Sequence, residues 1–160
     1  ITTSPVDGLT LAASYIEKDD EVGSPAVIQE YKGGSVAGKY ALNSVTVGLG
    51  YTLHAPTHQH KTAGTRYVQH YENTSFSIGY AVNEALTVSY TNEESEAHTV
   101  TKDVDDTTTD DSVEFEIEAI QAAYTMGGMT LSLAHKSLEN SDYTLNKDHK
   151  HTIFAVQMAF

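Results

Sequence analysis

The residues best suited to chemistry in this chain are carboxylates crowded between positions 103 and 111. Five aspartates fall in that stretch: Asp103, Asp105, Asp106, Asp110 and Asp111. Carboxylate oxygens are the ligands that Ca²⁺, a hard cation, prefers in proteins. The spacing lacks the glycine and the glutamate that an EF-hand loop requires. The stretch is therefore either a loop-bound calcium site or a solvated acidic loop without an ion.

Histidines form a second group of candidate ligands. They are His54, His58, His60 and His70 and, near the C-terminal end, His149 and His151. Neutral imidazoles two to four residues apart can bind Zn²⁺ or Cu²⁺. The alternative is a polar loop whose histidines titrate near neutral pH. The sequence leaves both interpretations open.

A hydrolytic site would need a nucleophile beside a base and a carboxylate. Ser141, Asp142, His149 and His151 are close enough in the chain to meet across one loop. However, the chain contains no nucleophile-elbow motif to fix their geometry. We therefore expect no catalytic residues and no enzymatic activity.

The composition limits the partners and cofactors that we expect. The 160 residues carry a formal net charge of −13, which repels phosphate backbones and argues against nucleic acid. With no cysteine, the chain has neither disulfides nor thiolate metal sites. Apart from the candidate calcium site we expect no cofactor. No apolar run approaches the roughly 20 residues that a membrane helix requires.

The elements that must position these residues are β-strands. Apolar and polar residues alternate, as strand residues do, in eight segments: 8–16, 31–42, 44–54, 67–82, 86–91, 113–126, 129–136 and 150–160. Residues 1–6 are expected to be the tail of a preceding strand and its turn. The pattern predicts an all-β, antiparallel, up-and-down fold in a single domain over residues 1–160.

Short turns and long connections alternate along the chain. The short turns are expected at Asn43, Asn83–Glu84 and Gly127–Gly128, because Asn and Gly tolerate the positive φ angles of tight hairpins. The long connections are expected at 17–30, 55–66, 92–111 and 139–149. One tight rim and one elaborate rim are typical of transmembrane β-barrels. A soluble barrel with core tyrosines is the alternative.

The last strand points to the same class. Phe154, Val156, Met158 and Phe160 share one parity, so one face is apolar and ends on an aromatic residue. A transmembrane barrel places its closing strand there, with the apolar parity in lipid. We therefore predict a barrel in a bacterial outer membrane.

Three segments resemble a known family. The stretches AVNEALTVSY, IQAAYTMGGMTLSLAH and the terminal VQMAF are similar to the C-terminal half of Gram-negative general porins. The resemblance implies a trimeric diffusion channel in contact with outer-membrane lipids and lipopolysaccharide. It also implies that Phe154, Val156, Met158 and Phe160 form the signal read by the outer-membrane assembly machinery.

The parity opposite to the apolar one would line the pore. Its candidate residues are Lys39, Thr46, Thr52, Ser75, Ser77, Thr87, Ser89, Gln121, Thr130, Ser132, Lys136 and Gln157. Small, uncharged side chains suit the wall of a wide, wet pore, whereas an eight-stranded barrel is filled by its own side chains. We therefore expect eight visible strands of a larger, 16-stranded barrel.

The predicted function is passive diffusion of small hydrophilic solutes and ions. Acidic loops at the mouth favour cations over anions. The alternative is a complete eight-stranded barrel that acts as an adhesion, receptor or structural protein through these loops.

One strand breaks the alternation. Val113, Phe115 and Ile117 share one parity, whereas Ile120 and Tyr124 share the other. A β-bulge near Glu118 would absorb the slip. Alternatively, the upper part of the strand rises above the bilayer, where the apolar rule no longer applies.

Overall fold

The computed structural model describes residues 1–18, 27–59, 66–102 and 108–158. The strands are β1 (Thr2–Val6), β2 (Leu9–Lys18), β3 (Val27–Gln29), β4 (Tyr31–Leu42), β5 (Val45–Ala55), β6 (His58–Gln59), β7 (Arg66–Ala81), β8 (Leu86–Lys102), β9 (Thr108–Met126), β10 (Met129–Glu139) and β11 (His149–Met158). A single 3₁₀ turn, η1 (Ser141–Tyr143), completes the regular structure of these residues.

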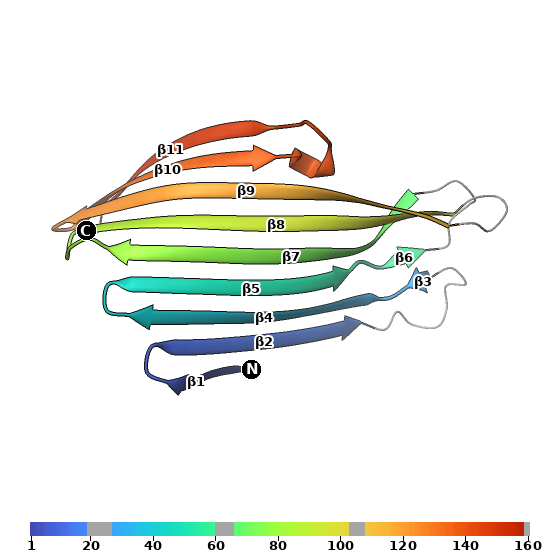
Figure 1. The fold of residues 1–160 in the computed structure, drawn as a ribbon, viewed down its shortest axis with the longest axis horizontal. Coiled ribbons are helices and arrows are strands. Elements are labelled where there is room, and N and C mark those ends of the chain that lie inside the picture. The colour runs from blue at the N-terminus through green and yellow to red at the C-terminus, as the bar shows by residue number, and fades with distance from the viewer. Residues whose placement is uncertain (19–26, 60–65, 103–107, 159–160) are drawn as a thin grey trace.

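Nine strands form one antiparallel sheet in the order β1-β2-β4-β5-β7-β8-β9-β10-β11 (Figure 1). Strands β3 and β6 pair separately. Because the order in the sheet follows the order in the chain, the predicted all-β, antiparallel, up-and-down fold is confirmed. The sheet is open, since β1 pairs with β2 alone and β11 with β10 alone in the described part of the chain.

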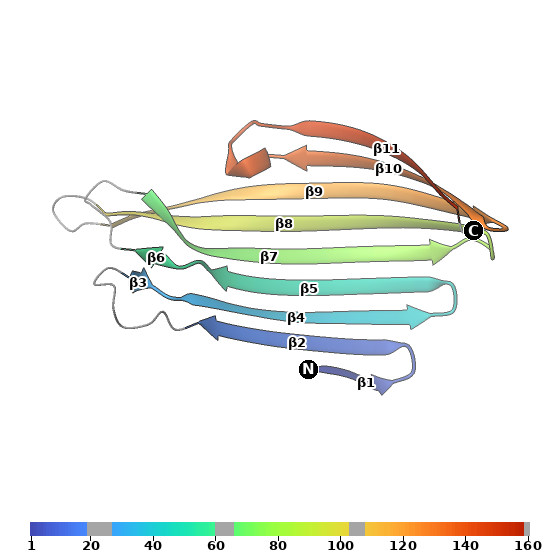
Figure 2. The same ribbon diagram turned by 180° about the vertical axis from the view of Figure 1, so that it is seen from behind.

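The three predicted short turns lie together at one end of the sheet, called here the short-turn end (Figure 1). Asn43 and Gly127 have φ angles of 52° and 59°, as expected for tight hairpins. In the β7–β8 turn, Asn83 Oδ1 accepts hydrogen bonds of 2.9 Å from the backbone N–H groups of Ala85 and Leu86. Strands β2, β5, β8 and β10 end at the opposite side of the sheet, called here the long-loop end, as Figure 2 shows from behind.

The predicted connection at 92–111 is largely wrong, because β8 continues to Lys102 and β9 begins at Thr108. The residues in question are mostly polar on both parities. A strand with water on both sides needs no apolar alternation, so polarity alone did not mark the end of the strand.

The break of parity in the sixth predicted strand is not caused by a bulge. Strand β9 pairs with β8 from Lys102 to Leu86 and with β10 from Glu139 to Met129, in both cases without a register shift. The side chains therefore keep their alternation through Glu118, and it is their polarity that reverses.

The register assigns every strand residue to one of two faces. The Leu49 face bears Leu11, Val36, Leu49, Phe76, Val88, Tyr124, Leu133 and Phe154, and the Ser75 face bears Ser14, Ser35, Gly50, Ser75, Thr91, Ala119, Lys136 and His151. Most exposed large apolar side chains lie on the Leu49 face, with Leu49 itself 62% exposed; Ile16 and Ile153 are exceptions on the Ser75 face.

The described residues form no conventional hydrophobic core. Their buried apolar side chains are Ala97, Val100 and Ala119, all small or medium-sized, and no large side chain is fully buried. A soluble sheet normally buries one face against a second layer. In the described residues, no helix is long and apolar enough to cross a membrane.

Candidate functional site

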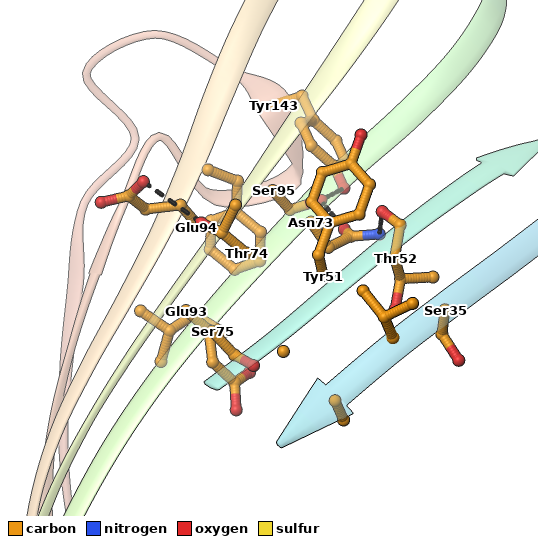
Figure 3. A pocket seen from close by; sticks show the side chains of 15 residues that line it. Ser35, Tyr51, Thr52, Asn73, Thr74, Ser75, Glu93, Glu94, Ser95 and Tyr143 are labelled. Carbon is orange, nitrogen blue, oxygen red and sulfur yellow. Dashed lines mark hydrogen bonds between the residues drawn. The ribbon is translucent and has the colours of Figure 1, made fainter. Parts of the chain in front are cut away.

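A cavity of about 500 Å³ lies on the Ser75 face towards the long-loop end (Figure 3). Strands β4, β5, β7, β8 and β9 contribute side chains to its wall, and η1 contributes Tyr143. Because the strands are adjacent in one sheet, hydroxyl and amide groups from several of them reach the same space.

A chain of polar contacts crosses this cavity. The hydroxyl groups of Tyr143 and Ser95 lie 2.7 Å apart, and Ser95 Oγ also donates a hydrogen bond to Asn73 Oδ1. Asn73 Nδ2 donates in turn to the backbone oxygen of Thr52 over 3.5 Å. The contacts join η1 to β8, β7 and β5 (Figure 3).

Aromatic rings form a row across the same end of the Ser75 face. His54 lies 5.1 Å from Tyr31 and 5.7 Å from Tyr71, measured between ring centroids. Tyr143 lies 5.5 Å from Tyr71 and 5.9 Å from Phe115, the latter in an edge-on arrangement. Each such pair adds roughly 0.5–1.5 kcal/mol beyond the area that it buries. The row therefore fixes the segment that carries Tyr143 over the sheet.

The segment before β11 is held by its own polar groups. Asn140 Nδ2 donates to the backbone oxygen of Glu114 over 3.0 Å, and Asn140 Oδ1 accepts from the backbone of Asn146. Lys147 Nζ lies 2.6 Å from Asp142 Oδ2, and this hydrogen bond and charge lower the pKa of the Asp142 carboxyl. Positive φ angles at Asn140 and Asn146 make the tight path possible.

The twelve predicted pore-lining residues all lie on the Ser75 face. The register places Thr130 opposite Gln157 and Ser89 opposite Gln121, and Gly48 lies between Ser77 and Lys39. Backbones and small side chains approach closely here: a Cβ atom on Gly48 would lie 2.6 Å from Ser77 Oγ. Small and polar side chains therefore predominate on this face between the aromatic row and the short-turn end, with Ile153 as an exposed apolar exception.

At the long-loop end of the Leu49 face, glutamates replace the apolar side chains. Cross-strand pairing forms two rows, Glu72–Glu96–Glu114 and Glu94–Glu116–Glu139. Like charges that are directly opposite destabilise a sheet. Loss of hydration and the negative charges of Glu94, Glu116 and Glu96 raise the pKa of the Glu114 carboxyl. Negative charge is therefore concentrated at this end of the Leu49 face.

The predicted aspartate site is only partly described. Asp103, Asp105 and Asp106 lie outside the described residues, and Asp110 is described only as part of the backbone of β9. The Asp111 carboxylate lies 2.9 Å from Arg66 Nη2. Asp110 and Asp111 therefore belong to a strand, and Asp111 already has a cationic partner.

The predicted histidine cluster is divided between the two faces. His54 lies in the aromatic row of the Ser75 face, and His58 Nε2 lies 2.6 Å from the backbone oxygen of Val68. His60 lies outside the described residues. His70 is on the Leu49 face, where its ring stacks on His98 at 4.3 Å.

The four residues considered for catalysis make no hydrogen bonds to one another. Ser141 is buried and its Oγ has no partner among the described residues. Asp142 pairs with Lys147, and His149 stacks on His151 at 6.2 Å.

Of the predicted assembly signal, Phe154, Val156 and Met158 lie on the Leu49 face, and Phe160 lies outside the described residues.

Four residues of these sites were not predicted from the sequence: Tyr143, Asn73, Ser95 and His98. A signal existed for His98, because His70 and His98 lie at equal distances along the chain from the predicted turn at Glu84.

In comparisons with protein-family models, with curated proteins and with solved structures, no match to this chain was found.

Proposed function

We propose that this chain forms part of the wall of a diffusion channel in a bacterial outer membrane. The Leu49 face would contact lipid and the Ser75 face would line water. The observation that carries the proposal is the one-sided exposure of large apolar side chains across β2 to β11. A single-layer sheet with one apolar face and one small polar face is what a barrel wall needs.

The height of the apolar surface supports this orientation. On β5 it runs from Val45 to Leu53. At about 3.3 Å per residue these nine residues span roughly 26 Å, close to the apolar band of about 25 Å in outer-membrane barrels. The acidic rows on β7, β8 and β9 would then lie outside the bilayer, next to lipopolysaccharide.

The open edges support a larger barrel. The outer edges of β1 and β11 have no strand partner in the described residues, and unpaired backbone groups are costly in lipid. Further strands would have to complete the wall. The small side chains of the Ser75 face fit a 16-stranded, water-filled barrel better than a filled eight-stranded one. The resemblance to porins adds a trimer to the proposal.

Small hydrophilic solutes and ions would cross such a channel by diffusion, with cations favoured. Carboxylates outnumber basic groups strongly, at 22 Asp and Glu against 9 Lys and Arg. Negative charge at a pore mouth concentrates cations.

Conductance in a planar lipid bilayer tests the proposal. The purified protein should give stepwise currents, and its reversal potential in a KCl gradient should indicate cation preference. Lys39→Glu, on the Ser75 face, should increase that preference, whereas Lys150→Glu, on the Leu49 face, should change it little. Absence of conductance would contradict the channel and would favour the alternative of an adhesion, receptor or structural protein. A preference for anions would contradict the proposed cation selectivity.

A further inference from the structure

Strands β7 and β8 carry the same short motif in opposite directions. His70-Tyr71-Glu72 on β7 faces Glu96-Ala97-His98 on β8. The antiparallel register places His70 opposite His98 and Glu72 opposite Glu96. Since alternate strand residues share a face, all four side chains project from the Leu49 face.

The potential ligand atoms converge. His70 Nε2 lies 3.5 Å from Glu72 Oε1, and His98 Nε2 lies 3.5 Å from Glu96 Oε2. One ligand atom each from His70, Glu72 and His98 can be chosen so that all lie within 4.8 Å of one another. Two ligands of one Zn²⁺ ion lie at most about 4.4 Å apart, because each bond is about 2.0–2.2 Å. Small side-chain rotations would therefore complete the site.

The imidazole of His98 contains a buried polar atom that is not hydrogen-bonded to the described residues. This atom is Nε2, and the nearby Glu96 Oε2 lies 3.5 Å away from it. A buried polar atom without a partner costs free energy, which a bound metal would recover. Glu114, paired with Glu96 on β9, adds negative charge beside the site.

A β-bulge interrupts the regular pairing of β7 with β8 next to these four residues. The register of β7 against β8 shifts between Val68 and His70, which leaves Gln69 as an extra residue. Bulges re-aim side chains and occur often beside functional sites. Beyond the bulge the pairing continues with a shift of one residue, from Val68 opposite Thr99 to Arg66 opposite Thr101.

We propose that His70, Glu72 and His98 bind a divalent transition-metal ion such as Zn²⁺, with Glu96 available as a fourth ligand. Two imidazoles and a carboxylate match the donor set of zinc sites, whereas Ca²⁺ and Mg²⁺ prefer oxygen ligands alone. The ion would link β7 to β8 beyond the apolar band. The site does not depend on channel activity, so either proposal can fail without the other.

A calorimetric titration tests the site: ZnCl₂ is added to the metal-free protein in detergent and the heat of binding is measured. We expect one Zn²⁺ per chain and at least tenfold weaker binding in His70→Ala and in His98→Ala. The matched control is the double variant His149→Ala/His151→Ala, which removes a stacked histidine pair on the Ser75 face and should bind as the unmodified protein does. Equal loss in the control, or no loss in the two site variants, would overturn the proposal.

Three further measurements test the assigned ligands. CoCl₂ should give the visible absorption of a low-coordinate nitrogen–oxygen site, and this absorption should disappear in His98→Ala while the strand content measured by circular dichroism stays the same. Glu72→Gln should weaken Zn²⁺ binding more than Glu84→Gln in the distant turn does. CaCl₂ binding as tight as that of ZnCl₂ would contradict the assigned donor set.

Discussion

Tyr143 shows how one side chain fixes a segment over a sheet. Its ring contacts Tyr71 and Phe115, and its hydroxyl meets Ser95. The ring contacts depend on aromatic area, whereas the hydroxyl contact depends on one hydrogen bond to a half-buried group. Substitution can separate these two contributions.

We expect Tyr143→Phe to keep the ring contacts and to lose the hydrogen bond to Ser95. The loss should lower the free energy of unfolding by about 1 kcal/mol, the usual net value of such a bond. Limited proteolysis between residues 140 and 148 should become faster. The control is Tyr124→Phe, whose hydroxyl makes no hydrogen bond with the described residues. Equal effects of the two variants would show that the hydroxyl of Tyr143 does not hold the segment.

The sequence identified histidines as possible metal ligands, but it grouped the wrong histidines together. The spacing of His54, His58 and His70 along the chain indicated one cluster, whereas alternation sends His54 and His70 to opposite faces. The partner of His70 is His98, which local spacing cannot show because it lies on another strand. The predicted turn at Asn83–Glu84 implied that register. However, residues 92–111 were predicted to be a loop, so His98 was not expected to pair with a residue of β7.

Strand β9 shows how one element can serve two environments. Near the short-turn end its Leu49 face carries Tyr124 and Ile120, and near the long-loop end the same face carries Glu116 and Glu114. The reversal requires no irregularity of the backbone. Only the side chains change along this face, from apolar to acidic.

The glutamate rows make the acidic end of β9 sensitive to pH. The pKa of Glu114 is raised in the folded chain, so the folded state binds its proton more tightly than the unfolded state does. Stability therefore rises as pH falls through this raised pKa and is lower above it. Glu114→Gln should stabilise the protein at pH 7.5 by about 0.5 kcal/mol, a small value because water screens exposed charges.

Denaturant unfolding at pH 7.5 and at pH 4 measures this difference. The gain from Glu114→Gln should shrink at the lower pH, where the carboxyl of the unmodified protein is protonated. Glu84→Gln, in the β7–β8 turn and outside both glutamate rows, is the control. A gain from Glu114→Gln that is larger at pH 4 than at pH 7.5 would contradict the repulsion between the rows.

At the level of elements, the sequence predicted where strands turn better than where they end. Asn43 and Gly127 adopt positive φ angles, a requirement that few residues meet, so their identity marks the turn. The ends of β8 and β9 near Lys102 and Thr108 have no such marker. Similarly, η1 depends on contacts of Tyr143 with distant strands, which local patterns do not contain.

At the scale of the whole molecule, the question is what covers the Leu49 face. The described chain forms a single layer, and its apolar residues are too exposed to form a core with one another. In water, such an exposed apolar surface would be prone to aggregation. In contact with lipid it would be stable, while the Ser75 face could stay hydrated. The two faces should therefore respond in opposite ways to the same charged substitution.

We expect Leu49→Arg and Thr46→Arg, both on β5, to separate the two environments. Leu49 lies in the middle of the apolar surface, where an arginine in contact with lipid costs roughly 2–4 kcal/mol. Thr46 lies on the Ser75 face between Ala41 and Gly79, which leave room for a longer side chain. Folding of the purified protein into lipid vesicles, followed by protease protection, should therefore fail or slow for Leu49→Arg alone. Thr46→Arg should insert normally and should shift the reversal potential towards anions. If both variants insert equally well, the Leu49 face does not contact lipid; if Thr46→Arg alone fails, the assignment of the two faces is inverted.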